Sequence, residues 1–188
     1  NFSGLIQVVF SFDNSNLRVE ISFFKFQFCS LISFFLDSIF DCDCYYALMT
    51  NLKYDFVCGV PYSASTFASS VCYAKHIPML LKRKEAKEYG TKKILEGAYL
   101  PGQTCLLLED VITTGASLIE TINVLEESGL VVSDICTLLE RNQGGKETLE
   151  QSGYKVHSVF DLRQIIDVLY SNKLITIDDK TKAESSIS

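Results

Sequence analysis

Two adjacent carboxylates beside a turn rich in hydroxyl groups are the residues of this sequence best suited to chemistry. Glu109 and Asp110 directly follow an apolar run at residues 104–108, which predicts a buried strand. The turn at residues 113–117 contains only Thr, Gly, Ala and Ser, and it leads directly into a helix. Backbone N–H groups in such a turn can point at an anion, and the helix N-terminus adds a partial positive charge. We also expect a Thr or Ser of the turn to cap the helix.

These features together predict a sugar phosphate as the ligand. Glu109 and Asp110 would repel a phosphate group, so we expect them to face ribose hydroxyls or a Mg²⁺ ion. A Walker A loop is excluded, because the sequence has no Gly-Lys-Thr or Gly-Lys-Ser triplet. The alternative is an ordinary strand, turn and helix with acidic residues near the start of the helix.

A basic segment at residues 82–93 gives a second indication of an anionic ligand. It contains five Lys, one Arg and two Glu in a chain whose net charge is −6. We interpret it as a mobile basic lid loop that closes over a polyanion, with Gly90 and Gly97 permitting the movement. The alternative is a solvated charged loop, or a short exposed helix held by ion pairs one turn apart.

Arg141 is the third candidate for ligand binding. It follows a strand predicted at residues 135–139, so we expect it at the same edge of the sheet as the hydroxyl-rich turn. A guanidinium group there suits a planar carboxylate, which it binds through two parallel hydrogen bonds. On spacing alone, a surface ion pair of Arg141 with Glu140 or Glu109 is an equally good interpretation.

Alternating strands and helices must position these groups. The alternation predicts an α/β fold with a mostly parallel, twisted sheet flanked by helices, in which ligands bind beyond the carboxyl ends of the strands. We expect Gly129 to end the helix whose apolar face carries Leu118, Ile122 and Leu125. The predicted strands are 56–60, 78–81, 104–108, 135–139 and 155–159, and the other helices are 64–75, a short one after the Gly-Gly pair at 144–145, and 162–170. Residues 82–98 are predicted to form a long loop, and the polar tail after Ile177 is predicted to fray.

Composition limits the class of protein. A chain of 188 residues that is 47% hydrophobic can bury one substantial core. Its acidic balance argues against general nucleic-acid binding, which needs clustered excess Lys and Arg. Seven scattered Cys, an odd number without metal-ligand spacing, are typical of reduced thiols, so we expect a cytoplasmic protein.

Residues 1–53 form an atypical, Phe-rich segment. Residues 1–50 hold 10 of the 13 Phe but only one of the 10 Gly. A membrane role is not expected, because Lys25 and Asp37 interrupt the apolar stretch before it reaches the roughly 20 residues that a span needs. A buried helix or a strand pair is the expected structure. Because the chain begins with Asn, we expect either a fragment or an imperfect gene model at this end.

At residues 54–175 the chain resembles a known family. Residues 106–117 resemble the ribose-phosphate signature of type I phosphoribosyltransferases, and the basic segment at 83–90 is similar to that of the orotate phosphoribosyltransferases. The sequences Cys-Gly-Val-Pro-Tyr at 58–62, Ile-Pro-Met at 77–79 and Arg-Asn-Gln-Gly-Gly-Lys at 141–146 resemble the version at the N-terminus of bifunctional UMP synthase. The resemblance implies a phosphoribosyltransferase core at 54–177 followed by a polar tail at 178–188.

The resemblance also implies an activity and a set of roles. The family transfers phosphoribosyl from 5-phosphoribosyl 1-diphosphate to orotate, with Mg²⁺, giving orotidine 5′-phosphate and diphosphate in the synthesis of UMP. Lys87 and Asp110 would be catalytic, and Thr113 and Arg141 would contact orotate. No residue is assigned as a direct metal ligand, because the substrate carries most of the Mg²⁺ contacts. A homodimer is implied, since the lid usually closes over the neighbouring subunit's site. The residues implied to bind phosphoribosyl diphosphate are Tyr62, Ser63, Arg83, Lys84, Lys87, Tyr89, Glu109, Asp110, Val111, Ile112, Thr113, Thr114, Gly115, Ala116 and Ser117.

The first fifty residues depart from the family pattern. Phe-Lys-Phe-Gln at 24–27 is only a faint counterpart of the family's Phe-Lys-Phe-Gly, so no ligand role is transferred to Lys25. The later Ser-Pro-x-Tyr-x-Asp stretch of the family is absent. Two alternatives therefore stay open beside the orotate enzyme: a phosphoribosyltransferase for another base, and an inactive or truncated domain that binds phosphoribosyl diphosphate without turnover.

Overall fold

The computed structural model describes residues 7–13, 16–22, 42–84, 94–185 and 187. The chain divides into two units, residues 1–36 and residues 37–188. The first unit contains an antiparallel hairpin of β1 (Gln7–Asp13) and β2 (Asn16–Ser22), in which Gln7 is paired with Ser22 and Asp13 with Asn16. A strand pair is therefore present in the Phe-rich segment, as one of the two expected structures.

The second unit is built on a six-stranded sheet with the order β5-β4-β3-β6-β7-β8. All neighbouring strands are parallel except β4 and β5, which confirms the predicted α/β fold with a mostly parallel sheet. The strands are β3 (Phe56–Gly59), β4 (Met79–Lys82), β5 (Leu95–Glu96), β6 (Thr104–Ile112), β7 (Val131–Glu140) and β8 (Lys155–Asp161). The helices are α2 (Ser63–Lys75), α3 (Ala116–Glu127), α4 (Gly145–Gln151), α5 (Leu162–Ser171) and α6 (Ile177–Ser185), and residues 42–49 are also helical.

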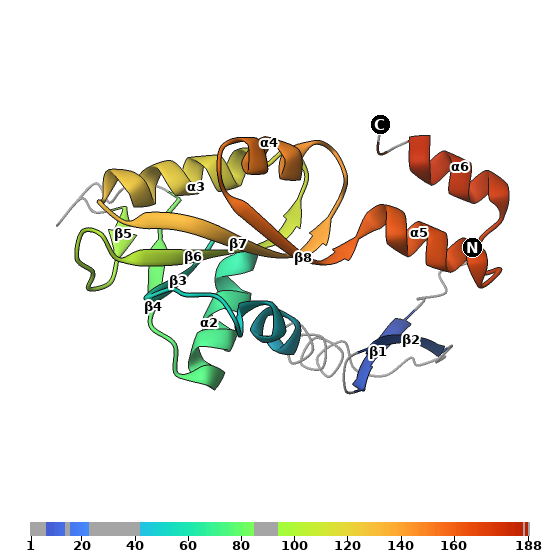
Figure 1. The fold of residues 1–188 in the computed structure, drawn as a ribbon, viewed down its shortest axis with the longest axis horizontal. Coiled ribbons are helices and arrows are strands. Elements are labelled where there is room, and N and C mark those ends of the chain that lie inside the picture. Colours follow the sequence, from blue (N-terminus) through green and yellow to red (C-terminus); the bar gives the residue numbers. More distant parts are fainter. Residues whose placement is uncertain (1–6, 14–15, 23–41, 85–93, 186, 188) are drawn as a thin grey trace. The chain divides into compact units, whose positions relative to one another are not determined.

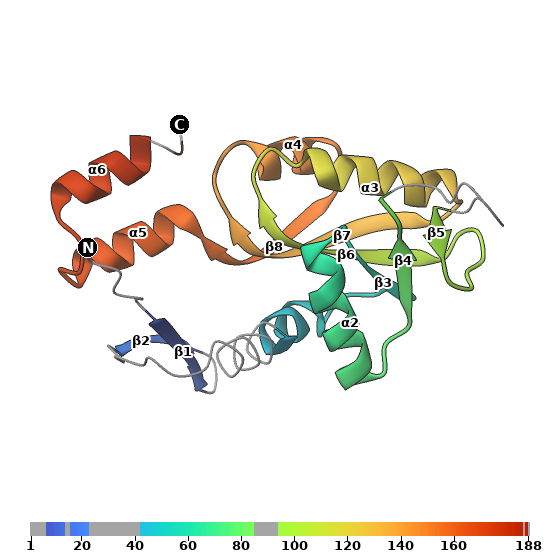
Figure 2. The same cartoon turned by 180° about the vertical axis from the view of Figure 1, so that it is seen from behind.

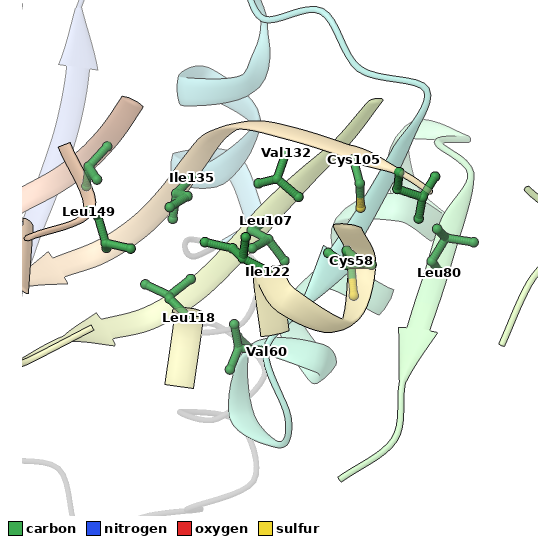
Figure 3. Packing of buried hydrophobic residues seen from close by; sticks show 14 of the residues in the cluster. Cys58, Val60, Leu80, Cys105, Leu107, Leu118, Ile122, Val132, Ile135 and Leu149 are labelled. Carbon is green, nitrogen blue, oxygen red and sulfur yellow. The ribbon is translucent and has the colours of Figure 1, made fainter. Parts of the chain in front are cut away.

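Helices cover both faces of this sheet. Figures 1 and 2 show α3 and α4 on one face and α2 on the other. On the α3 face, Leu118, Ile122 and Leu125 are fully buried, as their spacing predicts, and they join strand residues such as Leu107 in one cluster (Figure 3). On the opposite face, α2 packs with the helical residues 42–49, of which Tyr45 and Met49 are fully buried. The sheet is thus covered on both sides, which explains its continuous apolar strands.

Several strands differ from the prediction, and β7 begins at Val131, four residues earlier than predicted. β6 continues to Ile112, because its ladder with β7 extends through the pairs Val111–Leu139 and Ile112–Glu140. The two carboxylates therefore lie inside the strand rather than after it. Residues 82–98, predicted as a loop, contain the short strand β5, which pairs antiparallel with β4; residues 85–93 lie outside the described residues.

The C-terminal prediction was wrong in one respect, because the polar tail forms α6 instead of fraying. The hydroxyl of Thr176 and the carboxylate of Asp179 cap its start reciprocally, with Thr176 N–H and Asp179 N–H as the donors. The Nζ atom of Lys180 in turn lies 2.5 Å from Oδ1 of Asp167 on α5. Among all described helices, none combines the length and apolar character that crossing a bilayer requires.

Candidate active site

The predicted site residues follow neighbouring strands along one edge of the sheet. β4, β3, β6 and β7 are consecutive in the sheet and parallel, so their carboxyl ends meet at the same edge. In this order they carry the basic residues after Lys82, the turn at 60–63, the acidic pair with the hydroxyl-rich turn, and Arg141. The structure thus gathers four segments that are far apart in the sequence.

The two adjacent carboxylates have different surroundings. Glu109 is buried, and its Oε2 accepts a hydrogen bond of 3.0 Å from the hydroxyl of Ser117. Burial, together with the neighbouring carboxyl of Asp110, raises the pKa of Glu109 to about 8. Asp110 is only half-buried, and its Oδ1 accepts from the N–H of Val111 at 2.8 Å. Glu109 therefore braces the hydroxyl-rich turn, while Asp110 is the more accessible carboxylate.

Two buried hydroxyl groups hold the backbone of the acidic pair. Tyr45 donates to the carbonyl oxygen of Glu109 at 2.6 Å, and Thr137 donates to the carbonyl oxygen of Asp110 at 3.2 Å. The ring of Tyr45 also packs against Phe67 of α2, with the centroids 6.1 Å apart. Tyr45 was missed as a site residue because it lies in the Phe-rich segment. The only signal in the sequence is that Tyr45 and Met49 have the spacing of one buried helical face.

The middle residue of the hydroxyl-rich turn is a left-handed glycine. Gly115 is the N-cap residue of α3, with φ of 78°, and no side chain caps the helix. The expectation of a Thr or Ser cap was therefore wrong, because the chain must turn sharply at a position that favours glycine. The first N–H groups of α3 have no partner within the helix, so an anion can accept hydrogen bonds from them. Thr114, Ala116 and Ser117 are exposed around these groups, and Thr113 is half-buried.

Gly145, the first residue of α4, packs directly against the backbone of this turn. Its N–H donates to the carbonyl oxygen of Thr113 at 3.0 Å. A Cβ atom at Gly145 would lie 2.3 Å from that oxygen and 2.8 Å from the nitrogen of Gly115, so a larger residue does not fit. The sequence reveals a Gly-Gly pair here, but nothing in it indicates that the second glycine touches the turn.

Lys84 of the basic segment lies beside the turn after β3. The Nζ atom of Lys84 is 5.4 Å from the ring centroid of Tyr62, the N-cap residue of α2, and Ser63 follows it. Tyr62 is 70% exposed, so both side chains are accessible to a ligand. Arg83 instead forms an ion pair with Glu96 of β5, with Nε 2.7 Å from Oε1. Lys87 and Tyr89, which are predicted to bind the ligand, lie outside the described residues.

Arg141 begins the loop after β7 and is exposed. Its backbone N–H donates to the carbonyl oxygen of Ile112 at 3.0 Å, which places the residue beside the end of β6. Glu140 is buried; its Oε1 accepts from the N–H of Asn142 at 2.7 Å, and burial raises the pKa of its carboxyl. Within the described contacts, no ion pair joins Arg141 to Glu140 or Glu109, so its guanidinium stays available to a ligand.

A metal ion would find oxygen ligands at this edge. Mg²⁺ is commonly held by one or two carboxylates together with substrate phosphates, and the half-buried Asp110 suits that coordination. Both oxygens of Glu109 are already occupied by Asp110 N–H and Ser117. In the described ranges, no group of three or more His, Cys, Asp or Glu side chains is arranged to hold an ion.

Sequence comparisons identify relatives of the unit at residues 37–188, which carries the candidate site. Residues 45–160 match the family model described as the phosphoribosyl transferase domain. The uridine 5′-monophosphate synthase of Bos taurus is 46% identical over 128 residues, which cover 68% of this chain and 27% of that protein. The orotate phosphoribosyltransferase of Chlamydia caviae is 36% identical over 140 residues, covering 73% of this chain and 68% of that protein. The chain thus spans about a quarter of the length of the synthase it matches.

A solved structure gives the same result for the fold. The UMP synthase of Leishmania donovani superposes with a TM-score of 0.73 and 26% sequence identity, covering 84% of this chain and 34% of that one. The fold that positions the candidate site is therefore similar to that of a UMP synthase.

Proposed function

The chain belongs to the phosphoribosyl transferase domain family and has its type I fold, and on this basis we propose that it is an orotate phosphoribosyltransferase. It would transfer the phosphoribosyl group of 5-phosphoribosyl 1-diphosphate to orotate in the synthesis of UMP. The observation that carries the proposal is the arrangement of basic, acidic, hydroxyl and guanidinium groups along one sheet edge, each of which suits one part of these substrates.

Each part of phosphoribosyl diphosphate has a partner in this arrangement. The turn at 113–117 offers free N–H groups and hydroxyls to the 5′-phosphate, and Asp110 on the same strand suits the ribose hydroxyls. Tyr62, after the neighbouring strand β3, and Lys84, after β4, suit the diphosphate. Arg141, exposed beside the end of β6, suits the carboxylate of orotate, with Thr113 next to it.

The arrangement also supports the chemistry. Transfer of a ribosyl group develops positive charge on the sugar and negative charge on the departing diphosphate. Lysine side chains beside the diphosphate stabilise that negative charge, and carboxylates near the sugar suit its positive charge. Mg²⁺ bound with the diphosphate would neutralise further negative charge. Lys87 is proposed as the catalytic lysine on the resemblance alone.

We further propose that the chain acts as a homodimer, as the resemblance implies. The partner would contribute basic residues to the neighbouring site. Analytical ultracentrifugation of the purified chain, with and without phosphoribosyl diphosphate, measures this directly, and a monomer under both conditions would contradict it.

One assay tests the proposed activity. The purified chain is incubated with orotate, phosphoribosyl diphosphate and Mg²⁺, and orotidine 5′-phosphate is measured; adenine in place of orotate is the control for base choice. We expect product with orotate only, and none when Asp110→Asn replaces the accessible carboxylate. Calorimetric binding of phosphoribosyl diphosphate without product would instead support the alternative, a domain that binds without turnover. Product with adenine would indicate a different base.

A further inference from the structure

Lys82 belongs to the basic segment predicted to form a mobile lid, but the structure places it at the end of β4 with a buried ammonium group and no assigned ligand contact. Its side chain is 3% exposed, and its Nζ atom is 2.7 Å from Oε1 of Glu120 on α3. The side chain of Glu120 is 67% exposed, so the ammonium group of the pair is shielded from solvent while the carboxylate is in contact with it. A buried ammonium group is stable only when it is paired, so Lys82 is committed to Glu120 rather than to a ligand.

The ion pair connects two segments of the site. Leu80 and Lys82 lie on the same face of β4, and Leu80 packs in the same cluster as Ile122 of α3 (Figure 3). Glu120 is about one helical turn after Ala116, which is the first residue of α3 and belongs to the hydroxyl-rich turn at 113–117, hereafter the phosphate turn after its proposed ligand. The pair therefore fixes the end of β4 against the start of the helix that follows the phosphate turn.

The residues that follow Lys82 have other partners. Arg83 is bonded to Glu96, and Lys84 lies over the ring of Tyr62. Lys82 is the main cause of the lowered pKa of Glu120, and Lys84 adds to it, so Lys84 is also within electrostatic reach of that carboxylate. With Lys82 neutralising Glu120, Lys84 is left to face a ligand beside Tyr62.

We propose that Lys82 is a positioning residue, whose ion pair with Glu120 holds Lys84 at the diphosphate end of the site. Without Lys82, the carboxylate of Glu120 would draw Lys84 toward itself, and the end of β4 would lose its tie to α3. The inference rests on the proposed function, since it requires a diphosphate to bind at Lys84 and Tyr62.

The test uses the full chain and the variants K82M, K82R, E120Q and K82M/E120Q. Two quantities are measured: the Kd of inorganic diphosphate with Mg²⁺ by calorimetry, and KM and kcat for phosphoribosyl diphosphate. We expect K82M to raise Kd and KM about tenfold, equivalent to 1.4 kcal/mol, with kcat changed much less. E120Q should also raise Kd. The double variant should cost no more than K82M alone, because both changes remove the same contact. K82R should recover most of the affinity, since arginine can also donate to Glu120.

The matched control is K180M, which removes another lysine from an ion pair, the one with Asp167 between α6 and α5. It should leave Kd and KM unchanged. An unchanged diphosphate Kd in folded K82M, or losses that add in the double variant, would overturn the inference. If K82M does not fold, E120Q weakens the same tie between β4 and α3 through the exposed partner, and an unchanged diphosphate Kd in E120Q then overturns the inference.

The two proposals fail in distinguishable ways. A wild-type chain that binds diphosphate but forms no orotidine 5′-phosphate would end the proposed activity, while the Kd values would still decide the role of Lys82. A wild-type chain that does not bind diphosphate would overturn the positioning role directly, because there would be no ligand for Lys84 to meet.

Discussion

Replacing Gly145 by alanine is expected to damage the phosphate turn without substituting any residue that is proposed to meet a ligand. A Cβ atom at this position would lie 2.3 Å from the carbonyl oxygen of Thr113, whereas real Cβ contacts essentially never fall below 3.0 Å. The two backbones must therefore separate by at least the 0.7 Å difference. Overpacking of this kind costs about 1–3 kcal/mol of folding stability. For a chain of this size, each kcal/mol lowers Tm by about 2–4 °C.

The same displacement should weaken phosphate binding. Thr113 begins the turn at 113–117, so moving its carbonyl oxygen moves the N–H groups and hydroxyls that follow it. A misplacement of about 1 Å can cost about 100-fold in rate, so a shift of 0.7 Å should lower kcat/KM for phosphoribosyl diphosphate more than tenfold; because the shifted groups are those proposed to bind the phosphate, the loss should appear as a raised KM. Steady-state kinetics of orotidine 5′-phosphate formation and calorimetric binding of phosphoribosyl diphosphate both measure this effect.

Gly144→Ala is the matched control. Gly144 has φ of 83°, but no heavy atom lies within 4 Å of a Cβ atom built there. Alanine in this left-handed conformation costs about 1–2 kcal/mol, which is similar to the loss expected at Gly145, yet it pushes against nothing. We expect G144A to lower Tm while KM stays near the wild-type value. Equal KM values for a folded G145A and the wild type would refute the steric argument, and equal rises in KM for both variants would refute the assignment to Thr113.

Three further changes test other parts of the site. The pKa of Glu109 is raised to about 8 from 4.5, so between these pH values the folded chain keeps a proton that the unfolded chain loses, and stability should fall as pH rises from about 4.5 to about 8. Glu109→Gln should flatten this slope of Tm against pH. An unchanged slope would contradict the burial argument. Tyr45→Phe leaves the buried carbonyl of Glu109 without its 2.6 Å hydrogen bond and should cost about 1–3 kcal/mol in denaturant unfolding, so an unaltered midpoint would show that the bond is not needed. Lys87→Ala should abolish product formation while Tm stays the same, and normal turnover would remove Lys87 from the mechanism.

The positions of the strands along the chain are predicted well from the sequence because the strands are buried on both faces of the sheet. Runs such as residues 56–60 and 135–139 are apolar and end in turn formers, and strands occur at both places. The prediction fails where a charged residue lies inside a strand. The run at 104–108 stops at Glu109, yet β6 continues to Ile112, because β7 extends the ladder to Glu140. No local pattern reveals how far a partner strand continues.

The site was predicted where its groups are close in the sequence. The acidic pair and the phosphate turn occupy nine consecutive residues, from 109 to 117, and both could be identified from residue types alone. Tyr45, Gly145 and Glu120 were not identified. Tyr45 reaches a carbonyl 64 residues away, and Glu120 pairs with a lysine 38 residues away. Such contacts depend on how the elements pack, and a single sequence has no signal for them.

The separation of the two carboxylates follows from strand geometry. Successive side chains of a strand point to opposite faces, so two adjacent acidic residues at the end of β6 cannot share one environment. Glu109 points to the face covered by α3, as Leu107 does, and there it is buried and bonded to Ser117. Asp110 points to the other face and keeps a half-exposed carboxylate. An acidic pair at this place therefore supplies one group that holds the phosphate turn and one that can meet a sugar, and their order in the sequence decides which is which.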